Sequence, residues 1–225
     1  MKKGTYVLIG LVLLVTVYFI FKGGNSERPV DKEKMSFFIT SVNPGGGGNL
    51  GGLLGADAYC RQLAESVGVT GKTWSAYLSL APTFTTGVVH AKDRIGTGPW
   101  YNAKGMMIAS DLDSLHGNNN LNKNTALSEK GGIVSGRGDD VNMHDILTGS
   151  NADGTWSTSG DDTTCKNWTS NTKGSAWVGH HDRMGIDDSA PMKSWNSSHA
   201  TRGCSPEDLK STGGGGLFYC FAVNK

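Results

Sequence analysis

Residues 52–79 read GLLGADAYCRQLAESVGVTGKTWSAYLS, and this stretch holds the clearest secondary-structure signal in the chain. Its first part places apolar side chains on one face of a helix, at the positions i, i+3, i+4, i+7, i+8 and i+11. The residues on this stripe are Ala56, Tyr59, Cys60, Leu63, Ala64 and Val67. Gly68 follows the stripe and predicts that the helix ends there. The alternating residues 73–80 then predict a strand.

The cysteines all follow an apolar N-terminal run, and none of them lies within it. They are Cys60, Cys165, Cys204 and Cys220. An even number of cysteines in the exported part of a chain predicts two disulfides in an oxidising compartment. Cys60 lies on the apolar stripe of the helix, so its disulfide would tie that helix to the core. The residues alone allow three pairings of the four cysteines.

The apolar run covers residues 5–21 and contains 17 residues without a charge. A spanning helix needs roughly 17–25 such residues. Lys2 and Lys3 precede the run, and the positive-inside rule places them in the cytoplasm. We expect a cytoplasmic tail over residues 1–4, a single transmembrane signal anchor over 5–21, a linker over 22–35 and an extracytoplasmic domain over 36–225, in the periplasm or at the cell surface. A cleaved signal peptide is the alternative, although no small-residue cleavage site follows the run.

The remaining segments predict a domain of the α+β class with long ordered loops. Residues 36–42 (SFFITSV) are typical of a strand, and residues 217–223 (LFYCFAV) are apolar on both faces, as in a central strand. Ser110 is expected to cap a short helix that ends at Gly117. Residues 118–162 are rich in Asn, Gly, Asp, Ser and Thr, so we expect loops there.

The charge of the predicted domain argues against a polyanionic partner. After Met35 the chain has 15 Lys and Arg against 17 Asp and Glu, a formal net charge of −2. Nucleic acids, heparin-like polysaccharides and anionic membrane surfaces each require a basic footprint on the protein. We therefore expect no nucleic-acid partner.

Residues 52–79, AKDRIGTGPWYNAKG (91–105), ILTGSNADGTW (146–156), TCKNWTS (164–170) and the closing RGC and GLFYCFA resemble, in this order, the endostatin domain of two vertebrate collagens. The resemblance covers nearly the whole predicted domain. It implies a C-type-lectin-like fold with nested disulfides, Cys60 with Cys220 and Cys165 with Cys204. Two family features do not carry over: residues 35–43 lack the zinc-binding histidines, and the acidic domain lacks an arginine-rich heparin surface.

The loop over residues 94–102 (RIGTGPWYN) is the first candidate ligand site. Aromatic rings on a loop braced by glycine and proline suit the recognition of a carbohydrate or a peptide, because the rings stack on C–H surfaces. The alternative is that Trp100 belongs to the core. The candidate ligand-binding residues are Arg94, Trp100, Tyr101, Asn102, Trp195 and Asn196.

Two clusters are candidate metal sites, for Ca²⁺ or Zn²⁺. His180, His181 and Asp182 are consecutive, and His144 with Asp145 are their expected companions. Adjacent histidines on a strand point to opposite faces, so structural hydrogen bonding is the alternative. Asp153 lies in an Asx-rich run that offers oxygen ligands of the kind Ca²⁺ prefers, although turn formation also explains that run.

These observations lead us to expect a membrane-anchored extracytoplasmic recognition module in a bacterial envelope. The module would bind a carbohydrate or a protein through its loops and would not be an enzyme. One alternative is a structural envelope protein that packs against partner chains. A weaker alternative is a metal-dependent enzyme built on His180, His181 and Asp182.

Overall fold

The structure, a computed structural model, describes Met1 and residues 29–223. The predicted cytoplasmic tail beyond Met1, the predicted anchor over residues 5–21 and the first part of the predicted linker lie outside the described residues. Within the part that is described, no helix is both long and apolar enough to cross a membrane.

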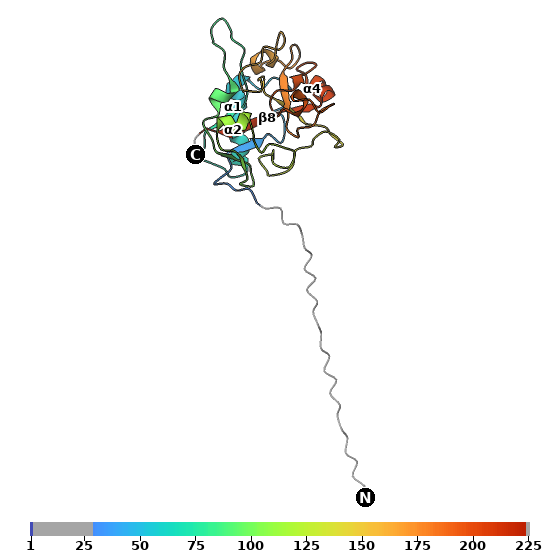
Figure 1. Ribbon diagram of the computed structural model, residues 1–225. Helices are drawn as coiled ribbons and strands as arrows, with labels where there is room; N and C mark the ends of the chain where they lie inside the picture. Colours follow the sequence, from blue (N-terminus) through green and yellow to red (C-terminus); the bar gives the residue numbers. More distant parts are fainter. Residues whose placement is uncertain (2–28, 224–225) are drawn as a thin grey trace.

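The centre of the fold is a mixed, six-stranded sheet around β8, the strand that the C-terminal sequence predicted (Figure 1). Its strands are β1 (Phe37–Ile39), β2 (Trp74–Ala76), β5 (Asp145–Leu147), β6 (Trp177–His180), β7 (His199–Ala200) and β8 (Gly214–Ala222). The C-terminal half of β8 pairs antiparallel with both β1 and β2, and its N-terminal half pairs in parallel with β5. β6 then pairs antiparallel with β5, and β7 with β6, so that β7 forms an edge.

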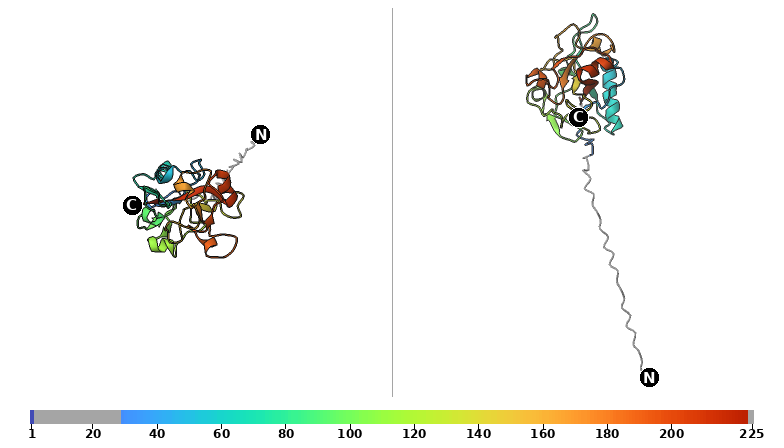
Figure 2. Two further views of the ribbon diagram at one scale, coloured as in Figure 1. Left: turned by 90° about the horizontal axis from the view of Figure 1, so that it is seen from above. Right: turned by 90° about the vertical axis from the view of Figure 1, so that its right-hand side faces the viewer.

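β8 is buried on both faces because each face of the sheet has its own core. Phe218, Cys220 and Ala222 belong to a cluster that includes α1 (Gly52–Ser66) and all four cysteines. The alternate residues of β8 belong to a second cluster of aromatic and aliphatic side chains from the loops. Viewed from above, β8 runs between α1 on one side and the loop-rich layer on the other (Figure 2). This period-2 alternation is what a central strand requires.

The predicted helix is confirmed as α1. Ala56, Cys60, Leu63 and Ala64 are its buried residues, and Tyr59 and Val67 pack against the same cluster. The chain leaves the helix at Gly68, whose φ of 81° is left-handed and whose N–H donates to the carbonyl of Glu65. Glycine adopts this conformation without steric cost, which explains why the helix ends there.

The disulfides are Cys60–Cys220 and Cys165–Cys204, the nested pairing. The first joins α1 to β8 across 160 residues of sequence. Cys165 opens α3 (Cys165–Trp168), a single turn in which all four residues have a φ between 46° and 64°. A left-handed turn of non-glycine residues is unfavourable. Two hydrogen bonds of the Asn167 side chain offset part of this cost. Its oxygen accepts from the N–H of Ala81, and its amide nitrogen donates to the carbonyl of Ala81.

The remaining elements are short. They are η1 (Ala91–Arg94), β3 (Trp100–Tyr101), β4 (Met107–Ala109), α2 (Leu112–His116), η2 (Pro191–Lys193) and α4 (Pro206–Thr212), and β3 pairs with β4 in a separate two-stranded sheet. The cap of α2 differs from the prediction by one residue. The side chain of Asp111, rather than that of Ser110, accepts a hydrogen bond from the backbone N–H of Ser114. The Ser114 hydroxyl oxygen in turn accepts one from the backbone N–H of Asp111.

The start of the domain and one strand also differ from the prediction. Met35 was placed in the linker, but it is fully buried, and the Asp31 N–H donates to the carbonyl of Ala103. The packed domain therefore begins before residue 36. β5 lies in a segment that was predicted to be loop, because three residues are too few to show an alternating pattern. Its partners β6 and β8 define it instead.

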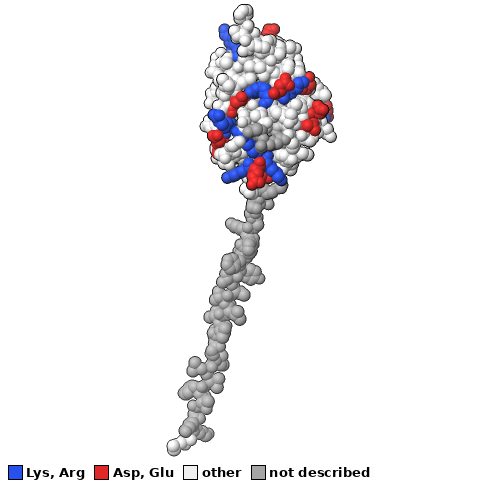
Figure 3. All heavy atoms as spheres, turned by 90° about the vertical axis from the view of Figure 1, so that its left-hand side faces the viewer, with Lys and Arg blue, Asp and Glu red and all other residues white. Residues whose placement is uncertain are grey.

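Acidic and basic side chains are interspersed on the face of the molecule shown in Figure 3. Neither sign of charge forms a broad continuous area on that face. This mixed distribution accords with the near-neutral composition of the chain, whose formal net charge is +1 at pH 7.

Candidate metal centre

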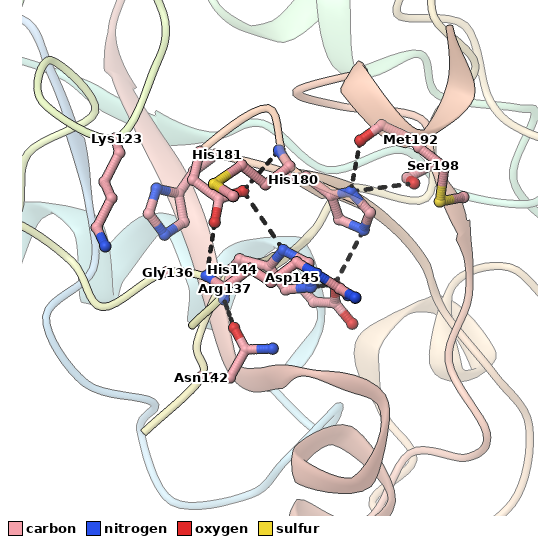
Figure 4. A network of polar contacts seen from close by, with 12 residues as sticks. Lys123, Gly136, Arg137, Asn142, His144, Asp145, His180, His181, Met192 and Ser198 are labelled. Atoms are coloured by element: carbon pink, nitrogen blue, oxygen red, sulfur yellow. Dashed lines mark hydrogen bonds and ion pairs between the residues drawn. The ribbon is translucent and has the colours of Figure 1, made fainter. Parts of the chain in front are cut away.

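A cluster of imidazole and carboxylate groups lies where β5, β6 and β7 meet (Figure 4). Asp145 begins β5 and His180 ends β6, and the two residues are direct partners in the antiparallel register. His144 precedes Asp145, and His199 begins β7 opposite Val178. The sheet thus brings together groups that are up to 55 positions apart in the sequence.

Gly179 allows a further segment to close over this corner of the sheet. A Cβ at residue 179 would lie 2.0 Å from the carbonyl oxygen of Trp195, so only glycine permits the approach. The segment before Trp195 consequently reaches β6, and the carbonyl of Ser194 accepts the N–H of His180 at 2.8 Å. This contact fixes the backbone that carries the His180 ring.

The three imidazoles converge on one oxygen of Asp145. The Nε2 atoms of His144, His180 and His199 lie 3.2, 3.3 and 3.5 Å from Asp145 Oδ1. The Nε2 atoms of His180 and His199 are 3.0 Å apart. One ligand atom each from His144, Asp145 and His180 lies within 4.8 Å of the other two. These three residues form the group that can hold a metal ion.

The other nitrogen of each ring is held by an oxygen that can only accept a hydrogen bond. The pairs are His144 Nδ1 with Asp182 Oδ1 (3.4 Å), His180 Nδ1 with the Met192 carbonyl (2.8 Å) and His199 Nδ1 with the Ala200 carbonyl (3.1 Å). A proton on each Nδ1 would satisfy these three contacts, while the 3.0 Å contact between the His180 and His199 Nε2 atoms requires a proton on one of those two nitrogens. The His144 and His180 rings are stacked, with centroids 4.2 Å apart and an angle of 12° between their planes, so one ring must turn before both Nε2 atoms can bind the same ion.

Asp145 is a buried carboxylate that lacks a conventional hydrogen bond. It is 2% exposed, and no donor within the described residues reaches either oxygen in hydrogen-bond geometry. Burial alone would raise the pKa of Asp145, but the facing His180 and His199 imidazoles outweigh it, and the pKa lies below its ordinary value. The Asp145 carboxylate in turn raises the pKa of His199. A buried anion requires a cation beside it, which is either a protonated ring or a metal ion.

The predicted neighbours His181 and Asp182 are not part of the group that can hold an ion. Figure 4 shows the His181 ring on the side of Lys123, away from Asp145. Its Nε2 lies 3.2 Å from the Ser135 carbonyl, and burial lowers the pKa of His181. The divergence follows from the alternation of side chains along an extended chain. His181 is therefore a buried core residue instead of a ligand.

Asp182 acts on the cluster through His144. Its Oδ1 faces the His144 Nδ1, and its Oδ2 accepts the N–H of Arg137 at 2.7 Å. Burial opposes ionisation of Asp182, but the His144 ring and the backbone N–H groups of Arg137 and Met184 hold its pKa well below the ordinary range. Asp182 is thus an ionised group that orients a candidate ligand.

The donor set fits zinc better than calcium. Zinc binds imidazole nitrogen and carboxylate oxygen at about 2.0–2.2 Å, so adjacent ligands of a tetrahedral ion lie roughly 3.3 Å apart. The distances from Asp145 Oδ1 to the His144 and His180 Nε2 atoms, 3.2 and 3.3 Å, have this length. Calcium prefers six to eight oxygen ligands, and the group that can hold an ion offers one carboxylate.

Asp153, the other predicted calcium ligand, lies outside this group. Its Oδ1 accepts from both the N–H and the hydroxyl of Thr155, and its Oδ2 lies 3.9 Å from Lys92 Nζ. These contacts stabilise a turn, as the Asx-rich sequence also suggested.

Most of the predicted ligand-binding loop is structural. Trp100 is fully buried and packs edge-on against Phe221 with ring centroids 5.4 Å apart. Asn102 is 1% exposed, and its side chain holds the turn that follows it. The Arg94 guanidinium forms two hydrogen bonds with Asp57, at 2.7 and 2.9 Å, which link η1 to α1. These three side chains are therefore not available to a ligand, because the fold already uses them.

Trp195 and Asn196 lie together at a cavity, while Tyr101 lies elsewhere. The Trp195 ring packs on Tyr77, and the Asn196 side chain donates to the Tyr77 hydroxyl at 2.9 Å. Both residues line a cavity of about 350 Å³ that is also lined by His116 and Arg183. Tyr101 is half-buried beside Lys72 in a smaller cavity.

His199 is the residue that the sequence prediction missed. It lies alone between Ser and Ala, so nothing local marks it as a functional residue. Only the pairing of β7 with β6 brings it beside His180. No protein-family model matches the chain, and no curated protein matches it.

Proposed function

We propose that the protein binds a divalent transition-metal ion of the zinc class through His144, Asp145 and His180. The observation that supports this most strongly is the Asp145 carboxylate. It is buried, and its Oδ1 faces three imidazole Nε2 atoms at 3.2 to 3.5 Å. A buried carboxylate requires a cation beside it, and a metal ion shared with the facing imidazoles would supply that charge.

The test is elemental analysis of the full-length chain, purified in detergent without chelator and then dialysed against a trace of Zn²⁺. We expect one zinc per chain, and loss of that zinc in Asp145→Asn and in His180→Gln. His181→Gln is the matched control, because His181 is equally buried and adjacent but faces Ser135. A chain that retains no zinc, or a control that loses as much zinc as His180→Gln, would refute the proposal.

The wider role that we propose is that of a membrane-anchored, extracytoplasmic recognition module rather than an enzyme. The nested disulfides support export, because disulfides persist in oxidising compartments. The α+β sheet, the early helix tied to the last strand and the long loops support an endostatin-like, C-type-lectin-like domain. In this proposal the metal ion holds the loops before β5 and after β6 in place.

Recognition of a carbohydrate or a protein at the Trp195 cavity is the second candidate function. The Arg183 guanidinium lines this cavity, and its acceptors among the described residues are uncharged: the carbonyls of Leu121 and Lys193 and the Asn119 side-chain oxygen. A glycan array probed with the full-length chain, with and without Ca²⁺, tests the carbohydrate reading. If no glycan is bound under either condition, carbohydrate recognition is ruled out.

A further inference from the structure

We infer that the Trp195 cavity binds a sugar acid, a unit of the hexuronic acid class, whose carboxylate pairs with the Arg183 guanidinium. The inference rests on carbohydrate recognition at this cavity, the second candidate function above, and adds the chemical class of the sugar. It is independent of the proposed metal centre. Three features of the cavity support it: a cation without a carboxylate partner, a lining without acidic groups and a wall of small and hydroxyl-bearing residues.

The Arg183 side chain is fixed in place. Its Nε donates to the carbonyl of Leu121 and its Nη1 to the carbonyl of Lys193, each at 2.9 Å, and its Nη2 donates to the Asn119 side-chain oxygen. Arg183 also has a φ of 60°, a left-handed conformation that is unfavourable for a residue other than glycine. Backbone strain of this kind is concentrated at functional sites. A guanidinium held in this way loses little freedom when a ligand binds.

The charge of Arg183 has no anionic partner in the described part of the chain. Its three acceptors are uncharged, and no carboxylate there lies within ion-pair distance of the guanidinium. Two acidic residues follow on the next loop, but Asp187 accepts from the N–H of Ser189, and Asp188 pairs with Lys193 at 2.7 Å. Burial lowers the pKa of Arg183, although arginine stays protonated in proteins. A partly buried cation without an anion is costly, and a carboxylate ligand would supply the missing charge.

Two N–H groups of the guanidinium remain for a ligand. An arginine side chain has five N–H donors, of which the three acceptors use one on Nε and one on each terminal nitrogen. Each terminal nitrogen therefore keeps one N–H without an acceptor among the described residues. A carboxylate can accept from such groups in charge-assisted hydrogen bonds, which are stronger than neutral ones.

The cavity has room for a monosaccharide unit and contains no competing carboxylate. Its volume is about 350 Å³, and its lining, within the described residues, includes neither Asp nor Glu. His116 also lines the cavity. The His116 Nε2 faces the Tyr77 hydroxyl at 2.8 Å, and burial lowers the pKa of His116, so its ring is neutral. The cations at the cavity are thus Arg183 and Lys193, and Lys193 already has Asp188 as its partner.

The wall beside Arg183 suits a ligand that is rich in hydroxyl groups. It is formed by small and hydroxyl-bearing residues, namely Gly117, Ala152, Ala190, Ser194 and Ser197. None of the large hydrophobic side chains that are exposed on the described structure lines this cavity. The Ser197 hydroxyl accepts from Trp177 Nε1 at 3.0 Å, which leaves its own proton for a ligand oxygen. A carboxylate on a polar body therefore fits better than a fatty or an aromatic acid.

The experiment measures binding to the full-length chain in detergent by isothermal titration calorimetry. The probes are D-glucuronate, D-galacturonate and D-mannuronate, each compared with the neutral hexose of the same configuration, and acetate is the carboxylate without a sugar. We expect at least one of the acids to bind about tenfold or more tightly than its hexose, and more tightly than acetate, because the pairing with Arg183 adds charged hydrogen bonds. Arg183→Gln should reduce the affinity for that acid to the level of its hexose. The control Arg202→Gln, an exposed arginine outside the cavity, should bind as the unaltered chain does.

A second variant tests the place of binding without removing the contacts that Arg183 makes to the backbone. Ala190 is exposed and lines the cavity, so Ala190→Phe should obstruct the cavity and leave the core unchanged. We expect this variant to melt at the temperature of the unaltered chain and to lose binding of the acid. This result remains decisive if Arg183→Gln does not fold.

The outcomes separate this inference from carbohydrate recognition in general. If none of the acids binds, the sugar acid is ruled out, and the glycan array decides by itself whether the cavity recognises another carbohydrate. Hexoses that bind as tightly as their acids would leave carbohydrate recognition intact and overturn the role of the carboxylate. Acetate that binds as tightly as the acids would overturn the role of the sugar. Unchanged binding in Ala190→Phe, or equal affinities of Arg183→Gln and Arg202→Gln, would place the acid elsewhere and overturn the inference.

Discussion

Asp182 lies next to the proposed ligand His144 and would affect the proposed metal centre without binding the ion. Its carboxylate faces His144 Nδ1 at 3.4 Å and anchors the backbone of Arg137 at 2.7 Å. Groups of this kind fix the tautomer and direction of a ligand ring, and their loss commonly costs metal affinity. The effect of Asp182 is therefore expected to be moderate, unlike that of Asp145.

Replacing Asp182 by Asn should weaken Zn²⁺ binding by about 10- to 100-fold, because the neutral amide holds the His144 ring less strongly. Competition with a chromophoric chelator measures the affinity. Asp153→Asn is the control, since Asp153 bonds Thr155, lies 3.9 Å from Lys92 and is outside the group that can hold an ion, so the affinity should be unchanged. An equal loss in both variants would mean that general negative charge, and not the contact with His144, sets the affinity.

The burial of Trp100 leads to a second prediction at this scale. Trp100→Ala should lower the free energy of unfolding by about 3–5 kcal/mol, because it opens a cavity against Phe221. Tyr101→Ala, at a half-buried neighbour, should cost clearly less. Chemical denaturation measures both values. A Trp100→Ala protein of unchanged stability would contradict its place in the core.

Among the elements, α1 and β8 were predictable from the sequence, because each buries its side chains with a regular period. The apolar stripe of α1 spans three turns, and β8 is apolar at every position from Leu217. The three-residue strands β1, β2 and β5 are too short to define their own ends. Their bounds follow from pairing with β8, which is a tertiary effect that local sequence does not carry.

The same limit applies to the candidate metal centre. His144, Asp145 and His180 are marked in the sequence because they adjoin other titratable residues. His199 has no such neighbours, and only the register of β7 on β6 brings it to the cluster. For Trp100 the sequence left both a ligand-binding ring and a core residue open, and the structure places it in the core. Sequence patterns predicted part of the site, and sheet register determined the rest.

The two disulfides should differ in how strongly they stabilise the elements that they join. On the chain-entropy model, the loop of 160 residues closed by Cys60–Cys220 contributes about 5 kcal/mol and the loop of 39 residues closed by Cys165–Cys204 about 4 kcal/mol. Replacing each pair by alanines should therefore destabilise the first variant more, as measured by urea unfolding. All four cysteines are fully buried, so the packing losses are similar. The reverse order of stabilities would contradict this expectation.

For the molecule as a whole, the proposed metal ion should act as a stabilising ligand. An ion that binds only the folded state at 100 times its dissociation constant adds about 2.7 kcal/mol. Removing it with a chelator should lower the melting temperature, and adding Zn²⁺ should restore it. The Asp145→Asn variant should melt at the same temperature with and without Zn²⁺. A chelator effect that persists in this variant would place the responsible ion elsewhere.

The two cores explain how a chain with 33 glycines can maintain long loops in a defined conformation. One core ties α1 and both disulfides to one face of the sheet, and the other packs the loop aromatics on the opposite face. Both cores share β8. A substitution that disturbs β8 should therefore affect the helix side and the loop side together.

The Cys60–Cys220 bond also determines how the protein would respond to mechanical load. If the chain is pulled by its two ends, tension passes from residue 60 to residue 220 through the bond, and the segment between them carries none of it. Only the residues before Cys60 and the few after Cys220 can lengthen. His144, Asp145, His180 and His199 all lie inside the shielded segment. A domain tethered at one end would thus keep these four side chains together under a force that separates β1 from the sheet.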